Sequence, residues 1–89
     1  MLITFDPDKN ILNIRNHGVS LAEAEFMDWD NALIWFDGRE DYGEDRHVAL
    51  GSIGNTLYYA AFCERGEETR MISMQRATNK EVKKYVNAT

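Results

Sequence analysis

The sequence predicts a small α+β domain in which an antiparallel β-sheet packs against two N-terminal helices and one C-terminal helix. Three strand-like segments follow one another between residues 46 and 76 with short turns between them, which favours antiparallel pairing. Helix-capping residues flank two apolar-periodic stretches near the start of the chain and one near its end. A length of 89 residues suits one domain with a modest core, so we take residues 1–89 as a single domain.

The N-terminal elements are a short strand and a capped helix. LITF (2–5) is a candidate for a short strand. Asp6 can cap a helix that begins at Pro7, where the missing backbone N–H costs nothing, and Gly18 can end it. We expect the apolar side chains of this helix to face the core; they are Ile11, Leu12 and Ile14.

A second helix is predicted after this glycine. Ser20 begins it, and Glu23 stands three residues later, as in a capping box. Leu21, Ala24 and Met27 (or Phe26) recur at helical spacing and are expected to face inward. The two helices together then fill roughly residues 7–28.

The remaining elements are read from apolar runs and turn residues. LIWF (33–36) fits a strand or a helical turn, and the acidic tract 37–45 predicts a loop. Three further strands are predicted at 46–53, 56–64 and 68–76, joined by a Gly54-Asn55 turn and an Arg65-Gly66 turn. A final helix should follow Thr78, with Glu81 completing its capping box.

The Arg65-Gly66 turn fixes an expected register for the last hairpin. Ala61 would lie opposite Arg70, and the more apolar face would be the core face. That predicted core face carries Leu57, Tyr59, Ala61, Ile72 and Met74, with Arg70 and Arg76 at its ends. The other face suits stacking and hydrogen bonding to RNA, unless a helix covers it; it carries Tyr58, Ala60, Phe62, Met71, Ser73 and Gln75.

Charge is divided unevenly along the chain. The net charge of −5 argues against nucleic acid, but residues 1–45 hold eleven acidic against three basic residues. Residues 46–89 hold seven basic against four acidic residues, which indicates a basic lobe or a chance imbalance. The single Cys63 excludes an intrachain disulfide, and no leader or apolar run of membrane-spanning length is evident. We therefore expect a cytoplasmic protein with no membrane partner.

Several segments, taken together and in order, resemble the BrnT family of bacterial type II toxins. No single one is specific, but the ordered set covers nearly the whole chain. They are FDPDKN (5–10), HGVSLAEA (17–24), RHVALG (46–51), ERG (64–66), RMIS (70–73) and RATNKE (76–81), with Tyr85 behind. The resemblance implies a RelE-like fold and a metal-independent endoribonuclease without cofactors that arrests translation. It also implies a BrnA-type antitoxin as partner, with operator DNA bound only through that antitoxin.

Metal-free RNA cleavage requires a base, an acid and a cation that stabilises the phosphorane. His17 is the candidate base or acid, because imidazole exchanges protons near neutral pH; the alternative is that it caps its helix. Arg65 is the candidate transition-state clamp, because guanidinium matches phosphate oxygens, or else it is an ordinary turn arginine. Arg76 is a further catalytic candidate. His17, His47 and Cys63 do not form a metal motif.

Four further residues are candidates for RNA binding, namely Arg46, Arg70, Lys80 and Tyr85. Each has a structural alternative. An arginine can pair with a nearby carboxylate, the lysine can be merely solvated, and the tyrosine can pack the last helix onto the sheet. Trp29 and Trp35 flank an apolar segment and suit either the core or an antitoxin contact.

Three positions depart from the family pattern by lacking a positive charge. Asn16 stands where the family usually has lysine, Asn55 where it often has arginine, and Gln75 where it usually has arginine. A missing transition-state cation would lower activity by a factor of about ten to a thousand. A second hypothesis is therefore a catalytically degenerate toxin that acts only as an antitoxin-binding module in operon autoregulation.

Overall fold

The computed structural model describes residues 1–39 and 43–89, and residues 40–42 of the predicted loop 37–45 lie outside that description. The predicted strands are confirmed to within one residue, and LIWF is a strand. The elements in order are β1 (Leu2–Phe5), α1 (Pro7–His17), the 3₁₀ helices η1 (Leu21–Phe26) and η2 (Trp29–Asn31), β2 (Leu33–Asp37), β3 (Arg46–Ile53), β4 (Thr56–Arg65), β5 (Glu68–Arg76) and α2 (Asn79–Ala88).

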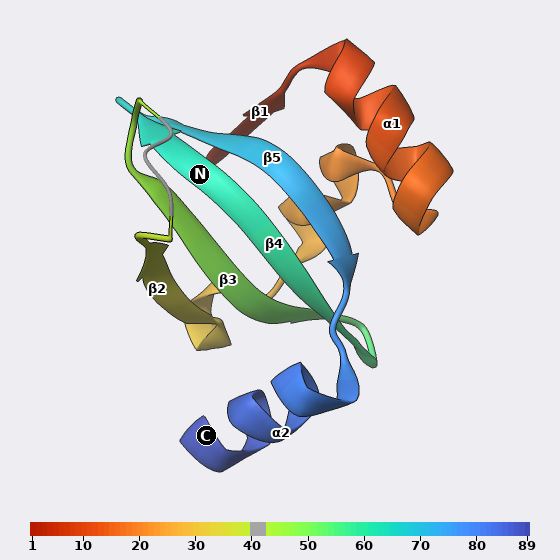
Figure 1. Cartoon of the computed structure of the whole chain (residues 1–89), viewed down its shortest axis with the longest axis vertical. Helices are drawn as coiled ribbons and strands as arrows, with labels where there is room; N and C mark the ends of the chain where they lie inside the picture. Colours follow the sequence, from red (N-terminus) through yellow and green to blue (C-terminus); the bar gives the residue numbers. More distant parts are fainter. Residues whose placement is uncertain (40–42) are drawn as a thin grey trace.

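The five strands form one mixed sheet in the order β1-β5-β4-β3-β2 (Figure 1). Strands β2 to β5 are antiparallel as predicted, but β1 pairs with β5 in parallel. The prediction of a purely antiparallel sheet was therefore wrong at β1. The reason is topological, because β1 is separated from β5 by most of the chain, and a long connection allows either orientation.

Helix α1 has the predicted caps but not the predicted buried face. The Asp6 carboxylate accepts from the Asp8 N–H at 2.9 Å, and the Gly18 N–H donates to the Ile14 carbonyl at 2.8 Å. The apolar side chains expected in the core are about half exposed; they are Ile11, Leu12 and Ile14. The buried residue is Asn13, which is only 5% exposed. The prediction for this face was wrong because α1 lies beside the edge of β5 (Figure 1), where a polar backbone needs partners.

Asn13 completes the edge of β5 after β1 has ended. Its amide nitrogen donates to the carbonyls of Met74 and Val19, both at 2.9 Å. Its amide oxygen accepts from the Met74 N–H at 3.0 Å. One side chain therefore replaces a strand neighbour at Met74 and also anchors the turn after α1.

We expect Asn13→Ala to destabilise the protein by roughly 2–4 kcal/mol, because it leaves buried backbone groups of Met74 without partners. Urea unfolding followed by tryptophan fluorescence measures this. Asn16→Ala is the matched control, since Asn16 is exposed on the same helix, and it should change stability by less than about 0.5 kcal/mol. Equal effects of the two changes would contradict the role of Asn13.

The predicted second helix is a 3₁₀ helix, η1, rather than an α-helix. The Ser20 hydroxyl caps it by accepting from the Ala22 N–H at 3.2 Å. Leu21, Ala24 and Met27 are buried as expected, whereas the alternative, Phe26, is 68% exposed. A spacing of three residues places these buried side chains on one line of a 3₁₀ helix, which has three residues per turn.

The last hairpin differs from the predicted register. Its turn is Gly66-Glu67, with Gly66 at φ +60°, and Arg65 pairs with Glu68. Cys63, and not Ala61, therefore lies opposite Arg70. A β-bulge at Ile72 adds a further shift, since Met71 pairs with Phe62 while Ser73 pairs with Ala61.

The main cluster of buried side chains lies on the face of the sheet that was predicted to be open. We call this the inner face; its buried members on β4 and β5 are Ala60, Phe62, Met71 and Met74. Leu57, Tyr59 and Ala61 were predicted to form the core face, and they point to the opposite, outer face. Ala61 is nevertheless buried there, at 6% exposed, as are its neighbours Val48 and Leu50 on β3. Leu57 and Tyr59 are only partly buried. The bulge explains why Met71 and Met74, three residues apart, both point inward. The two faces of the hairpin are similarly apolar, and η1 packs on the inner one.

Helix α2 begins with the predicted capping box, because Thr78 and Glu81 each accept from the other's backbone N–H. It lies against the end of the sheet farthest from β1 (Figure 1). The Lys84 ammonium lies 4.0 Å from the Trp35 ring centroid, and the Tyr85 hydroxyl donates to the Asn31 carbonyl at 3.3 Å. Within residues 1–39 and 43–89, no helix is both long and apolar enough to cross a membrane.

Candidate nucleic-acid interface

Four basic side chains from separate elements line one cleft of about 330 Å³, which we call the arginine cleft. Lys9 comes from α1, Arg46 from β3, Arg65 from β4 and Arg70 from β5. Two acidic residues, Asp6 and Glu44, and the bulge segment Met71–Ile72 complete its lining. Four cationic against two anionic side chains give this cleft a positive excess, although the whole chain is acidic.

Arg65 is held in the arginine cleft by a carboxylate. Its guanidinium donates to both oxygens of Glu44, from Nη2 at 2.7 Å and from Nε at 3.1 Å. These hydrogen bonds lower the pKa of Glu44 below its usual range. Burial, and then the nearby charge of Glu44, raises the pKa of the Cys63 thiol beside them. The fork of Arg65 is thus already arranged for a two-oxygen anion.

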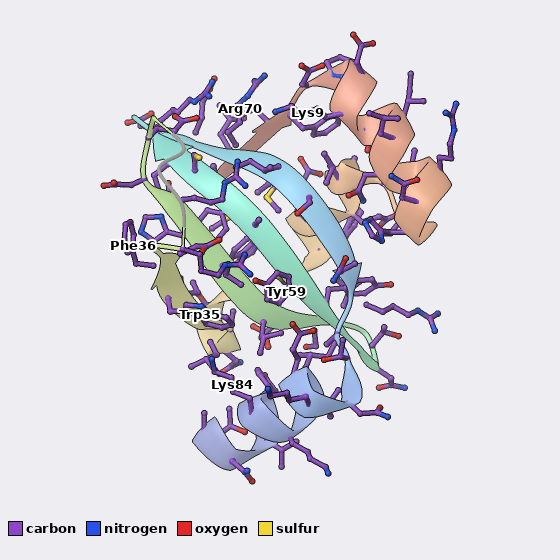
Figure 2. The ribbon with its side chains drawn as sticks, in the orientation of Figure 1. Lys9, Trp35, Phe36, Tyr59, Arg70 and Lys84 are labelled. Carbon is purple, nitrogen blue, oxygen red and sulfur yellow. The ribbon has the colours of Figure 1, made fainter. Side chains whose placement is uncertain are left out.

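Lys9 and Arg70 present their charges differently. Neither forms a hydrogen bond or an ion pair with any other residue in the described ranges. Figure 2 shows the two side chains close together between the start of β5 and the first turn of α1. The alternative in which Arg70 pairs with a carboxylate is therefore not seen among the described contacts, and both side chains line the cleft.

A second cleft adjoins the arginine cleft along β5. It shares Lys9 and Ile72 with the first, and we call the two together the β5 groove. The second cleft is lined by Lys9, Leu12, Asn13, Asn16, His17, Ile72 and Ser73. His17 is exposed as the last residue of α1, and among the described contacts its imidazole does not cap the helix. The fold thus places His17 and Arg65 at opposite ends of one groove, with Lys9 between them.

The other candidate residues lie outside the β5 groove. Arg76 is exposed at the end of β5, opposite Tyr58. Lys80 lines a separate hollow on α2 with Trp35 and Lys84. The hydrogen bond from Tyr85 to η2 agrees with the alternative in which this tyrosine packs the last helix onto the sheet.

Two charged residues of the groove, Lys9 and Glu44, were not singled out from the sequence. Lys9 reaches the cleft because β1 pairs in parallel with β5, which brings the first turn of α1 next to Arg70. Glu44 reaches Arg65 from the acidic loop, twenty-one residues away in the chain. A signal for Lys9 was present in the segment FDPDKN, but the topology that gives it meaning is not local.

A second ion pair lies near the β2–β3 loop. Arg39 donates to both oxygens of Asp37, from Nε at 2.8 Å and from Nη2 at 2.9 Å. The Asp37 side chain is 4% exposed. The hydrogen bonds from Arg39 lower the pKa of Asp37 to about 2.

This lowered pKa predicts an acid-sensitive contribution to stability. A carboxylate whose pKa falls on folding stabilises the native state above its unfolded pKa and loses that effect as pH falls toward the folded value. The advantage of the protein over Asp37→Asn should therefore be present at pH 6 and shrink between about pH 4 and pH 2. Denaturant midpoints at several pH values measure it, with the exposed Asp8→Asn as control. A constant difference down to pH 2 would contradict the assignment.

No three His, Cys, Asp or Glu side chains of the described chain gather closely enough to hold a metal ion together.

The chain matches a known family over most of its length. The family model for the ribonuclease toxin BrnT of type II toxin–antitoxin systems matches residues 5–81. The 1.1 Å crystal structure of the Brucella abortus ribonuclease toxin BrnT is similar, with a TM-score of 0.72 and 28% identity over 89% of this chain and 99% of that chain. No curated protein matches this chain. The family match covers both ends of the β5 groove and every strand of the sheet except most of β1. The chain therefore belongs to the BrnT family of ribonuclease toxins of type II toxin–antitoxin systems.

Proposed function

We propose that this chain is an endoribonuclease that cleaves RNA lying along the β5 groove, without a metal ion, and thereby inhibits translation. The observation that carries the proposal is the alignment of an exposed imidazole, His17, with the cationic arginine cleft through the shared Lys9. Phosphate neutralisation dominates affinity for nucleic acids, so a groove with a local positive excess suits RNA even in an acidic protein.

The groove can supply each part of metal-free cleavage. In the proposed reaction, His17 takes the proton of the 2′-hydroxyl, whose oxygen attacks the adjacent phosphorus. The bond from phosphorus to the 5′-oxygen breaks, and a proton passes to that oxygen, either from the imidazolium of His17 or from water. Lys9, the cation that both clefts share, stabilises the charge of the phosphorane, while Arg65 and Arg70 hold phosphates farther along the strand.

The pair between Arg65 and Glu44 supports a phosphate position at this end of the groove. A phosphate offers the same two-oxygen edge that the Glu44 carboxylate offers now, with donor–acceptor distances of 2.7 and 3.1 Å. We infer that the RNA phosphate replaces Glu44 on the guanidinium. The exchange conserves two charge-assisted hydrogen bonds and returns a carboxylate to water.

The remaining candidates serve a longer RNA strand in this proposal. Arg46 lines the arginine cleft and contacts a phosphate there. Arg76, Lys80 and Tyr85 lie toward α2, and we assign them to binding of flanking nucleotides rather than to the cleavage step.

The partner proposals follow from the family. We propose that a BrnA-type antitoxin neutralises this chain and that operator DNA is bound only through that antitoxin. The relation of the fold to RelE-like ribonucleases and a cytoplasmic location also remain predictions. A small basic protein encoded directly beside this chain would support the pairing.

Expression of this chain alone in bacteria is expected to arrest growth and degrade RNA. The purified protein should cleave a labelled RNA equally well with and without excess chelator, because in this proposal side chains, and not a metal ion, carry out the cleavage step. Co-expression of the antitoxin should restore growth. Intact RNA and normal growth would contradict the proposed activity, and loss of cleavage on chelation would contradict the metal-independent mechanism alone.

One observation favours the second hypothesis, in which the protein is only an antitoxin-binding module. Asn16 lines the β5 groove beside His17, where the family resemblance predicts a lysine. If this missing charge silences the protein, Asn16→Lys should create RNA cleavage that the unaltered chain lacks. Asn55→Arg is the control, because Asn55 lies in the β3–β4 turn and outside the groove.

A further inference from the structure

Strand β2 is an edge strand whose outward side has no neighbour in the described sheet. It pairs with β3 along Leu33–Asp37, and Figure 1 shows it at the border of the sheet. No other described segment hydrogen-bonds to the backbone of residues 33–36 on that side. An open edge of this kind can accept one more strand, since its N–H and C=O groups form half of a ladder.

The side chains of β2 add an apolar contact to this edge. On the inner face, Ile34 is 46% exposed and Phe36 is 58% exposed. Phe36 is the end of an aromatic row that runs into the core, with ring centroids 5.9 Å apart to His47, 5.7 Å from there to Phe62 and 5.4 Å onward to Trp29. Figure 2 shows Phe36 at the β2 edge of the sheet. Another strand could continue this row with its own apolar side chains.

The charge around β2 selects the chemistry of its partner. No lysine or arginine occurs between Arg15 and Arg39, and the exposed Asp28 and Asp30 stand directly before the strand. Lys84 lies against Trp35 on the outer face, so the acidic charge is concentrated at the start of β2. A second copy of this chain would bring acidic groups against acidic groups, and RNA would bring phosphates. A basic segment, in contrast, would be attracted.

We propose that the free edge of β2 is the docking site for an extended, basic segment of a partner protein. The segment adds to the sheet as a further strand, places apolar side chains on Ile34 and Phe36, and places lysine or arginine near Asp28 and Asp30. The identification of this partner as the antitoxin rests on the proposed function.

The position of this edge distinguishes it from the RNA site. The β5 groove reaches from the β1 border of the sheet to Arg46 on β3, which pairs with the last residue of β2, Asp37. Ile34 and Phe36 line neither cleft of the groove. Changes at Ile34 and Phe36 should therefore alter partner binding without altering RNA cleavage. This separation allows the two proposals to fail independently.

The test uses the full chain and the small protein encoded beside it. The double variant Ile34→Lys/Phe36→Lys places charges on exposed positions that discourage strand addition. We expect its dissociation constant for the antitoxin, measured by titration calorimetry, to rise at least a hundredfold. Ile11→Lys is the matched control, because Ile11 is an equally exposed aliphatic residue on α1 that lines neither part of the groove; its affinity should stay within threefold. Asp30→Lys should slow association, and added salt should weaken binding.

Hydrogen exchange locates the contact. Antitoxin should protect the amides of residues 33–36, and RNA should not. The inference would be overturned if the double variant bound the antitoxin with unchanged affinity, or if the antitoxin protected only amides outside residues 33–36. It would also be overturned if the unaltered chain did not bind the antitoxin, or if it associated with itself through β2. If the unaltered chain does not cleave RNA, the proposed function is contradicted. The affinity measurements would still decide whether β2 binds the antitoxin.

Discussion

Replacing His17 with alanine is expected to lower the rate of RNA cleavage by about 10² to 10⁴-fold, because the groove then lacks its proton-transfer group. RNA binding should change little, since the cations of the arginine cleft remain. Single-turnover cleavage of a labelled RNA under excess enzyme separates this chemical step from binding.

Arg15→Ala serves as the control for His17→Ala. Arg15 is exposed in the last turn of the same helix and lines neither part of the β5 groove. Cleavage by Arg15→Ala should stay within about threefold of the unaltered rate. A His17→Ala protein that cleaves at the normal rate would remove the imidazole from the mechanism, and the β5 groove would then serve for binding alone.

Replacing Arg65 with alanine should lower kcat/KM for RNA cleavage by about 10- to 100-fold, because a strand in the groove then loses a two-point, charge-assisted phosphate contact. Arg65→Lys should restore only part of the rate, because an ammonium cannot offer the planar two-donor fork that now holds Glu44. The salt dependence of RNA affinity should decrease by one phosphate contact in Arg65→Ala. Rates within threefold of normal in both variants would show that Arg65 is an ordinary exposed arginine at the end of β4.

The acidic partner of Arg65 gives an opposite expectation. Glu44→Gln removes the negative charge from the guanidinium, so RNA should bind more tightly, by about two- to fivefold on the scale of one exposed ion pair. Filter binding at fixed salt measures it. Weaker RNA binding in this variant would mean that Glu44 orients Arg65 rather than competing with the phosphate.

The local signals of the sequence predict the elements well. Proline, glycine and hydroxyl or carboxyl residues at helix ends act within a few residues, and so Pro7, Gly18 and the Thr78–Glu81 box were found at their observed places. The buried face of each element depends on what lies across from it. Asn13 is buried because β5 has an open edge at Met74, and no periodicity in α1 could have indicated that.

The same distinction explains the candidate site. His17, Arg65 and Arg70 were recognised by residue type, because their chemistry is visible in the sequence. The groove that joins them is not visible in the sequence, because it depends on the parallel pairing of β1 with β5 and on the bulge at Ile72. Arg76 illustrates the converse, because it belongs to a suitable motif and yet lies outside the groove.

The bidentate contact of Glu44 on Arg65 has a consequence for the size of the ligand. A carboxylate carried by the same chain acts as a tethered competitor with an effective concentration on the order of millimolar. A mononucleotide that offers one phosphate must overcome this competitor alone and will occupy the cleft poorly. A strand that also engages Lys9 and Arg70 gains contacts that the carboxylate cannot match. The internal ion pair thereby favours polymers over the free nucleotides that are abundant in a cell.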